Sequence, residues 1–446
     1  MTAKLDERFN QTSEALNQYK VDLRKSVGNI MSPLLWLPLK NSLDMITGTG
    51  SVTFSRASTA TYIDRYGVLK YASIDEPRFE KEGLLIEGPS TNLLLYSEDF
   101  SNSVWSKMNG LTVTSNTSEV TAPDGSNNAD IIEDTDNTQQ QWIRQGVIIP
   151  DDNSTYTFSV FVKKKTSNIC IIQTDLRNGT NEMWASILVN LDNGDTTLRT
   201  DLAVNNPYSY KVKYIEDGWY RVSVSIQNNS TGNTTLRTVI CPAVSDMSGD
   251  YDHEATGSIY VWGAQLEKLP FASSYIPTTD SAVTRAKDVC YVDALNNVPI
   301  APYFTDGTIV MDVDILGPNN INEIHKVNYI FSYNIDYTTY RGWFHLGGLV
   351  LQYMADHYGP WMTTGPIDKF INNTNRICMV HKSNGISKGY VNDVKFSEVT
   401  NQLPDLTSGD KLFIGTDDSR VLQLFGHISN FRIYDRALTD EEVALL

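Results

Sequence analysis

Apolar and polar residues follow one pattern near the start of the chain and another from about residue 34 onward. Near the start, Phe9, Leu16, Leu23 and Ile30 recur seven residues apart, as on one face of an α-helix. Farther on, apolar and polar residues alternate over short stretches, which is typical of β-strands that bury one face. The sequence therefore predicts an all-β fold, with two sandwiches in tandem, preceded by one N-terminal α-helix.

The N-terminal helix is predicted over residues 2–31, because Gly28, Asn29 and Pro33 supply stop signals. A helix at this position has little local core to cover, so we favour self-association in a coiled coil or bundle. Packing of the helix against the protein's own core is the alternative. The residues expected to form the oligomerisation seam are Leu5, Phe9, Leu16, Leu23, Val27 and Ile30.

The change of pattern divides the chain into five segments. Strand candidates are short between residues 34 and 96 and longer in the two regions that follow, which an extended stretch separates. The predicted segments are an assembly or attachment helix at 1–33, a small β connector at 34–96, a β-sandwich at 97–278, a linker at 279–300 and a second β-sandwich at 301–446.

The first sandwich is predicted from alternating stretches that recur at the spacing of an all-β domain, with turns such as LDNGD and EDGW between them. Trp219 and Trp262 lie within two of these stretches and are expected to fill the core. The candidate strands are WIRQGVII, TYTFSVFVKK, ICIIQTDL, ASILVNL, YKVKYI, WYRVSVSI, RTVICPAV and SIYVWGAQLEK.

The end of the chain predicts a last strand followed by a short helical turn. Residues 427–434 alternate between apolar and polar side chains. Thr439 is a good N-cap, and Glu442, three residues later, completes a capping box. Val443 and Leu446 are then expected to fold back on a core.

Charge and cysteine content exclude several classes of protein. The chain has 446 residues and a formal net charge of −17, which repels phosphate backbones and anionic membranes. We therefore expect no nucleic acid partner. The four cysteines, at positions 170, 241, 290 and 378, are far apart, which argues against a zinc site or a disulfide framework.

The N-terminus shows no basic segment followed by an apolar core, so no signal peptide is predicted. No apolar run approaches the roughly 20 residues of a membrane span, so no membrane insertion is expected. We therefore expect synthesis in a cytoplasm. If the protein acts outside a cell, it leaves by a route other than a cleavable signal peptide.

The sequence predicts no catalytic residues and no enzyme activity. The pattern E-x-D-x-x-E, which would place two carboxylates on one strand face, is absent, as are H-E-x-x-H and the P-loop. Asp312 and Asp314 do share a strand face, and we interpret them as the polar outer face of an edge strand. The six histidines are scattered, at positions 253, 325, 345, 357, 381 and 427.

No cofactor and no metal site is predicted. A structural calcium ion could still be bound, because Asp417 with Asp418, or Asp250 with Asp252, could supply oxygen ligands. Solvated acidic turns are the simpler interpretation of both pairs.

Candidate contacts to a sugar come from aromatic residues outside predicted strands or at the start of one. The loop MADHYGPWMTTGP places His357, Tyr358 and Trp361 beside glycine and prolines, where side chains are exposed rather than buried. A structural plug of the loop or a contact between subunits is the alternative. Trp142 in QQQWIRQ, at the start of a predicted strand, is a second candidate.

Three pieces of the last third of the chain resemble the concanavalin A-like, laminin-G-type jelly roll. NRICMVHKSNGISKGYVNDVKFSEV is similar to a hairpin of that family whose turn is at Tyr390–Asp393, KLFIGTDDS to its next strand, and FGHISNFRIYDRALTDEEVALL to its closing strand and helical cap. The resemblance implies a jelly roll here. It says little of function, because the fold hosts lectins, adhesins, hydrolases and spacers.

Two further stretches, residues 54–105 and 261–288, resemble segments of bacteriophage tail fibre and receptor-binding proteins. The sandwich between them is similar to carbohydrate-binding modules. The resemblance implies a virion protein, exposed on the phage tail, made in the host cytoplasm. Many such proteins are trimers and begin with a helical attachment segment, which fits the seam of the N-terminal helix.

The sequence thus predicts a non-enzymatic tail fibre or receptor-binding protein. Its expected partners are two further copies in a homotrimer, other phage tail proteins bound through the N-terminal segment, and a glycan or other receptor on the host surface. Repeated weak sites on such an oligomer would act through avidity. The alternatives are a purely structural tail or collar adaptor and, from another class, a hydrolase that degrades capsule.

Overall fold

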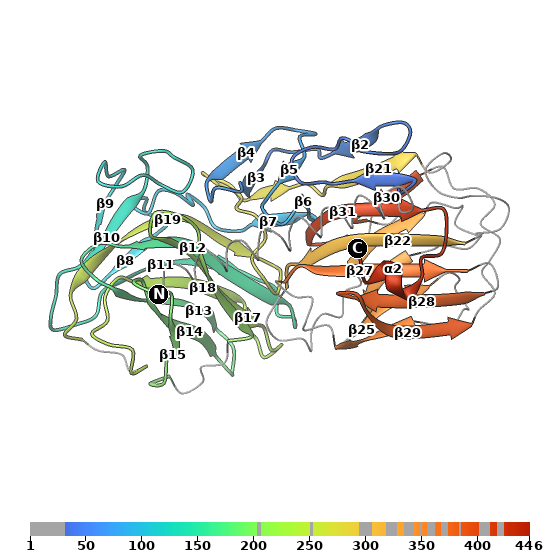
Figure 1. Ribbon diagram of the computed structural model, residues 1–446. Helices are drawn as coiled ribbons and strands as arrows, with labels where there is room; N and C mark the ends of the chain where they lie inside the picture. Colours follow the sequence, from blue (N-terminus) through green and yellow to red (C-terminus); the bar gives the residue numbers. More distant parts are fainter. Residues whose placement is uncertain are drawn as a thin grey trace, which may run out of the picture.

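A computed structural model describes the chain over residues 32–202, 207–249, 253–293, 306–317, 328–333, 343–347, 350–354, 362–366, 373–382, 385–400, 411–416 and 423–446. Within these residues nearly all regular structure is β-strand, which confirms the all-β prediction (Figure 1). The predicted N-terminal helix, with its six seam residues, falls outside them and stays a prediction. Among the described segments, no helix has the length and apolar character needed to cross a membrane.

The central sandwich consists of two six-stranded sheets that face each other across one core. Every strand predicted here from the alternation is present, with bounds shifted by no more than a few residues. One sheet has the order β16 (Ser209–Tyr214), β17 (Trp219–Gln227), β12 (Thr155–Lys164), β19 (Gly257–Glu267), β10 (Asp130–Asp134) and β9 (Thr112–Thr114). The other has the order β15 (Thr196–Leu198), β14 (Met183–Asn190), β13 (Ile169–Arg177), β18 (Thr235–Cys241), β11 (Trp142–Ile148) and β8 (Ser106–Met108).

The C-terminal sandwich also has two sheets around one core. The first has the order β29 (Val394–Thr400), β28 (Ile386–Val391), β27 (Asn375–His381), β22 (Gly307–Ile315), β31 (Gly426–Tyr434), β6 (Leu84–Ile86) and β5 (Arg78–Phe79), and β1 (Leu35–Leu37) also pairs with β31. The second has the order β2 (Val52–Ser55), β21 (Val289–Asp293), β30 (Lys411–Ile414), β23 (Asn328–Tyr333), β24 (Trp343–Gly347), β25 (Val350–Met354) and β26 (Met362–Pro366).

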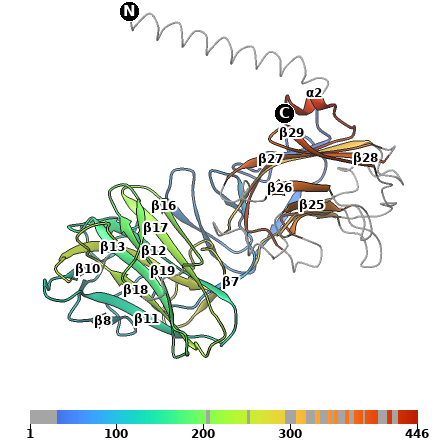
Figure 2. The ribbon, with the colours of Figure 1, turned by 90° about the horizontal axis from the view of Figure 1, so that it is seen from below.

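The central sandwich is an insertion into the C-terminal one. The chain leaves for the central sandwich after β7 (Ser90–Asn92) and returns at β20 (Val283–Arg285), and these two strands pair antiparallel. The strands β1, β2, β5 and β6, from the segment predicted as a connector, belong to the sheets of the C-terminal sandwich. The segment predicted as a linker contains β20 and β21. Figure 2 shows the two sandwiches as separate bodies, with β7 between them.

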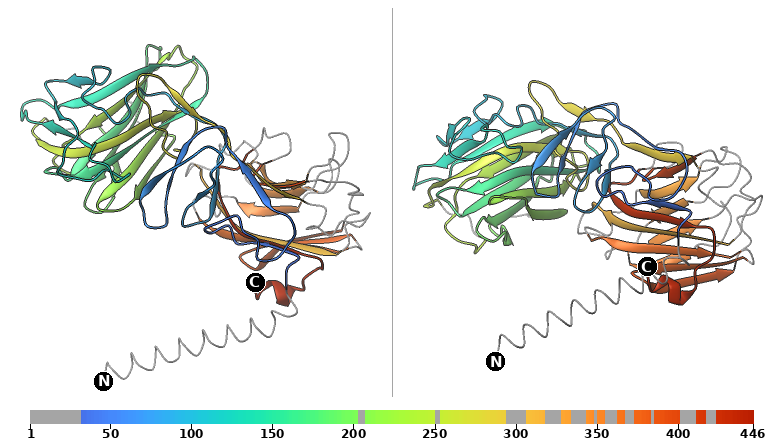
Figure 3. Two further views of the ribbon diagram at one scale, coloured as in Figure 1. Left: turned by 90° about the horizontal axis from the view of Figure 1, so that it is seen from above. Right: turned by 45° about the horizontal axis from the view of Figure 1, so that its top comes forward.

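The N-terminal segment also packs on the central sandwich. Its hairpin of β3 (Ala60–Ile63) and β4 (Leu69–Ala72) covers the outer face of the sheet that contains β12 and β19. There Leu69 shares an apolar cluster with Phe161, Trp219 and Trp262. Trp219 and Trp262 are therefore buried, as predicted, but beneath this hairpin rather than in the main core. Figure 3 shows the same segment, in blue, between the two sandwiches.

Local signals of the last third of the chain are confirmed. Asn392 and Asp393 have φ angles of +47° and +66°, the backbone of a two-residue turn, and Val391 pairs with Val394 across it. The capping box of α2 (Asp440–Val443) is complete, because Thr439 Oγ1 accepts from the Glu442 N–H at 3.2 Å and Glu442 Oε2 accepts from the Thr439 N–H at 2.8 Å. Val443 is fully buried under this cap.

Candidate functional site at the junction of the sandwiches

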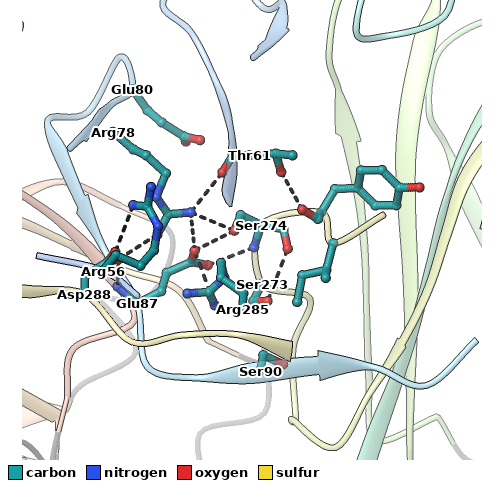
Figure 4. A network of polar contacts seen from close by, with 12 residues as sticks. Arg56, Thr61, Arg78, Glu80, Glu87, Ser90, Ser273, Ser274, Arg285 and Asp288 are labelled. Atoms are coloured by element: carbon teal, nitrogen blue, oxygen red, sulfur yellow. Dashed lines mark hydrogen bonds and ion pairs between the residues drawn. The ribbon is translucent and has the colours of Figure 1, made fainter. Parts of the chain in front are cut away.

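Three arginines and two acids form a buried cluster where the two sandwiches meet (Figure 4). We name Arg56, Arg78, Glu87, Arg285 and Asp288 the junction ion cluster. Arg78 lies at its centre, 2.6 Å from an Asp288 oxygen and 2.7 Å from a Glu87 oxygen. Arg56 approaches Asp288 at 3.2 Å and Arg285 approaches Glu87 at 3.5 Å. All five side chains are at most 1% exposed, so these ion pairs are shielded from solvent.

The cluster strongly favours the ionised form of Glu87. Burial opposes its ionisation, but Arg285 and Arg78 outweigh burial, so the pKa of Glu87 falls to about 2. Its oxygens also accept from the N–H of Ser274 at 2.8 Å and from its hydroxyl at 2.6 Å. Because Ser274 belongs to the chain that leaves the central sandwich, Glu87 ties the two sandwiches together.

A cavity of about 320 Å³ lies beside the junction ion cluster. Its walls come from the N-terminal segment, from β12, β16 and β17 of the central sandwich, and from the C-terminal sandwich. Tyr62, which is half-buried, contributes aromatic surface to it, while the rings of Phe161 and Tyr275 lie fully buried behind this wall. A cavity of this size, with aromatic and polar groups on its walls, is typical of a small-ligand site.

One wall of the cavity is acidic and includes a buried histidine. His427 Nδ1 lies 3.0 Å from Asp314 Oδ2, and its Nε2 lies 3.1 Å from Glu80 Oε2. Burial lowers the pKa of this imidazole, but the two carboxylates outweigh burial and raise the pKa of His427 to about 9. Glu82 lies on the same wall, with a carboxylate oxygen within 4.8 Å of the ligand atoms of Glu80 and His427.

Tight backbone packing positions this acidic wall. Asp314 and His427 face each other across the β22–β31 pair, and a Cβ added at the neighbouring Gly426 would lie 2.1 Å from the Asp314 carbonyl oxygen. Glu80 and Glu82 lie in the turn between β5 and β6, where the Glu80 N–H donates to the Gly83 carbonyl at 2.9 Å. Gly83 has a φ of +149°, and a Cβ there would lie 2.5 Å from the Ile428 carbonyl oxygen. Glycine at position 83 therefore allows the turn to lie directly on β31, and glycine at position 426 allows β31 to lie close to β22.

The opposite wall is cationic. Lys211, Lys213 and Arg221 reach the cavity from β16 and β17. Burial, together with the neighbouring charge of Lys213, lowers the pKa of Lys211 to about 8. The Arg221 guanidinium lies 5.3 Å from the centre of the Phe161 ring and donates to Ser159 Oγ at 3.1 Å, while its buried Nε has no hydrogen-bond partner among the described residues. The cavity thus presents cations and carboxylates on opposite sides.

The residues predicted as sugar contacts are not brought into this cavity by the described structure. His357, Tyr358 and Trp361 fall outside the described residues, as do the four aspartates named as calcium ligands. Trp142 is half-buried at the start of β11 and packs against an apolar cluster of the central sandwich. A receptor contact through any of the four aromatic and histidine residues stays a prediction.

The interpretation of Asp312 and Asp314 as the outer face of an edge strand was wrong. β22 lies inside its sheet, between β27 and β31. Asp312 is paired with Arg376 at 3.1 Å, and Asp314 is buried against His427. Sequence alternation shows which residues share a face, but it does not show whether another strand or segment covers that face.

Sequence reasoning missed the groups that meet at the junction. Glu80 and His427 are 347 positions apart, and no local pattern links them. A weak signal was present in charged residues that interrupt apolar strand stretches, such as Glu87 in GLLIEG and Arg285 in AVTRAKD. Such residues are rarely buried unless they are paired, so they indicate buried partners without naming them.

Comparison with protein families identifies the last part of the chain. Residues 336–444 match the sequence model of the concanavalin A-like lectin/glucanases superfamily. The C-terminal sandwich contains a concanavalin A-like, laminin G-type domain. No curated protein sequence matches the chain.

Several solved structures are similar in fold to about a third of the chain. The receptor-binding domain of botulinum neurotoxin D is 12% identical, with a TM-score of 0.30, over 35% of this chain and 40% of that one. The binding domain of Paraclostridial Mosquitocidal Protein 1 is 20% identical, with a TM-score of 0.27, over 36% and 42%. The CBM40 of Ruminococcus gnavus IT-sialidase, bound to α2,3-sialyllactose, is 14% identical, with a TM-score of 0.27, over 32% and 83%. The chain thus spans about two fifths of the length of the first two structures.

Proposed function

We propose that the protein is a non-enzymatic adhesion protein that binds a glycan in the junction cavity. The observation that carries this proposal is a cavity of about 320 Å³ with the half-buried Tyr62 ring and charged groups of both signs on its walls. Sugars are recognised by aromatic rings that cover their apolar faces and by polar groups that bond their hydroxyls. A lectin-type domain in the C-terminal sandwich supports the same conclusion.

The walls of the cavity favour a glycan that carries an acidic sugar. Lys211, Lys213 and Arg221 offer cationic donors to a carboxylate or sulfate, and hydrogen bonds that involve such charges are the strong ones. The carboxylates of Glu80 and Glu82, on the opposite wall, can accept from hydroxyl groups. A neutral oligosaccharide would offer these cations hydroxyl groups but no negative charge.

We further propose that the protein works on a bacteriophage tail, as a tail fibre or receptor-binding subunit exposed on the virion. The resemblance of residues 54–105 and 261–288 to such proteins supports this setting. The glycan would then belong to the host cell surface, and the N-terminal segment would bind other tail proteins. A structural tail or collar adaptor and a capsule-degrading hydrolase are the competing functions that the following experiments address.

Glycan binding is tested with the full chain on an array of neutral and acidic glycans. Lys211→Met is expected to weaken binding of an acidic glycan by tenfold or more, because about 1.5–3 kcal/mol is lost with a charge-assisted hydrogen bond. Lys70→Met, an exposed lysine of the N-terminal segment, is the matched control and should bind as the wild type does. If the protein binds no glycan on the array, the structural adaptor is favoured. If new reducing ends are released from a bound glycan, the hydrolase is favoured.

Assembly is tested by light scattering on the full chain at micromolar concentration. The wild type is expected to be a trimer, and Leu16→Asp with Leu23→Asp is expected to give monomers, because unpaired charges in a buried seam are strongly disfavoured. Asp substitution at Gln11 and Gln18, polar positions of the same segment, serves as the control. A monomeric wild type would contradict self-association through this helix.

A further inference from the structure

We propose that Glu80, Glu82 and His427 bind a divalent first-row transition-metal ion on the acidic wall of the cavity. One ligand atom from each residue lies within 4.8 Å of the other two. His427 Nε2 and Glu80 Oε2 are 3.1 Å apart. Two ligands that each lie about 2.1 Å from a tetrahedral zinc ion are separated by about 3.4 Å, so these two atoms need to move apart by only a few tenths of an ångström to become neighbouring ligands. The proposal concerns this ion alone and does not depend on glycan binding.

Asp314 is the positioning residue of the site. Its Oδ2 lies 3.0 Å from His427 Nδ1, which leaves Nε2 directed at Glu80. A carboxylate that accepts from one imidazole nitrogen while the other nitrogen binds the ion is the usual arrangement around histidine ligands of metals. The interaction fixes the orientation of the ring and keeps the proton on Nδ1 when Nε2 binds the ion.

A buried oxygen on Asp314 provides an independent indication of a missing ligand. Asp314 is 7% exposed, and its Oδ1 has no hydrogen-bond partner among the described residues. A buried carboxylate oxygen without a partner has lost its hydration with nothing to replace it, which is unfavourable. An ion next to His427, or a water that the ion holds, would supply the missing interaction.

The framework of the site is rigid before any ion binds. The β5–β6 turn lies close to β31 where Gly83 meets Ile428, and β31 lies close to β22 where Gly426 meets Asp314. The donors therefore come from fixed strands and a tight turn rather than from an open loop. An ion bound here would link the N-terminal segment, which carries Glu80 and Glu82, to the strand that carries His427.

The donor set selects the class of ion. Calcium and magnesium prefer oxygen ligands alone, whereas an imidazole nitrogen with carboxylates suits zinc or manganese. Three protein ligands leave at least one coordination position, which water can fill from the cavity. On binding, the ion replaces the proton with which Nε2 donates to Glu80, and that proton leaves to solvent.

The test uses the full chain after treatment with a chelator, titrated separately with zinc, manganese, calcium and magnesium chloride. Isothermal titration is expected to show one zinc or manganese ion per chain. Glu82→Gln is expected to weaken binding by tenfold or more, because it removes a direct ligand. Among the described residues the Glu82 carboxylate has no ion pair, so this variant should fold as the wild type does. Glu216→Gln, at an exposed position in the turn that follows β16, is the matched control and should leave binding of the ion unchanged.

A spectroscopic measurement identifies the ligands directly. Cobalt(II), which takes the place of zinc, is expected to give visible absorption bands in the wild type that change in His427→Gln. Absence of one-to-one binding, a preference for calcium or magnesium, or equal affinity in the wild type, Glu82→Gln and His427→Gln would each overturn the proposal. If His427→Gln does not fold, Glu82→Gln decides alone.

Discussion

Glu87→Gln is expected to lower the free energy of unfolding by about 3–5 kcal/mol, because it removes one partner of a buried network of charges. Arg78 and Arg285 would lose the carboxylate that compensates them, and the new amide group would direct donors toward guanidinium donors. Urea unfolding, followed by circular dichroism, measures the loss. Glu133→Gln, at an exposed position of β10, is the control and should change stability by no more than about 0.5 kcal/mol.

The same network predicts how stability depends on pH. The folded pKa of Glu87, about 2, lies below its ordinary value of 4.5. Its contribution is therefore fully present above pH 4.5 and is lost as the pH falls toward 2. The difference in stability between the wild type and Glu87→Gln should shrink over this range. A difference that stays constant from pH 7 to pH 3 would show that charge pairing at Glu87 does not stabilise the junction.

Trp262→Ala alone is expected to lower the free energy of unfolding by about 3–5 kcal/mol, the usual effect of truncating a fully buried tryptophan. Its ring lies 4.9 Å from that of Tyr275 and 5.4 Å from that of Phe161, and its Nε1 donates to Asn128 Oδ1 at 2.8 Å. The cavity left behind would lie under the β3–β4 hairpin. Hydrogen exchange should therefore increase in residues 60–72 as well as in β19.

Two variants separate packing from hydrogen bonding at this position. Trp262→Phe keeps most of the ring and loses the bond to Asn128, so it should cost about 1–2 kcal/mol. Tyr66→Ala removes an aromatic side chain that is 74% exposed and should be nearly neutral. Equal stability of Trp262→Ala and the wild type would mean that the hairpin does not depend on this aromatic cluster.

Local features of this protein were determined by the sequence, because each rests on interactions between neighbouring residues. Alternation located the strands of the central sandwich, since the side chains of a strand point to its two faces in turn. Thr439 and Glu442 determined the cap of α2, and Asn392 with Asp393 determined the turn between β28 and β29. The jelly-roll family of the last third of the chain followed from such local pieces in order.

Only the tertiary structure decided which strands share a sheet. The apolar run of Leu84, Leu85 and Ile86 indicates a buried strand, but it does not show that β6 pairs with β31, hundreds of positions away. Pairing of that kind depends on the closure of the whole fold around a common core. Local sequence patterns therefore could not predict that the central sandwich is inserted between β7 and β20.

The candidate site was decided by the same long-range assembly. Glu80, Asp314 and His427 come from three distant parts of the chain and meet only when the β5–β6 turn lies on β31. Each is an ordinary polar residue in its own stretch, with no motif around it. Burial and mutual distance give these side chains their chemistry, and both quantities exist only in the folded protein, because they depend on which segments exclude water from which others.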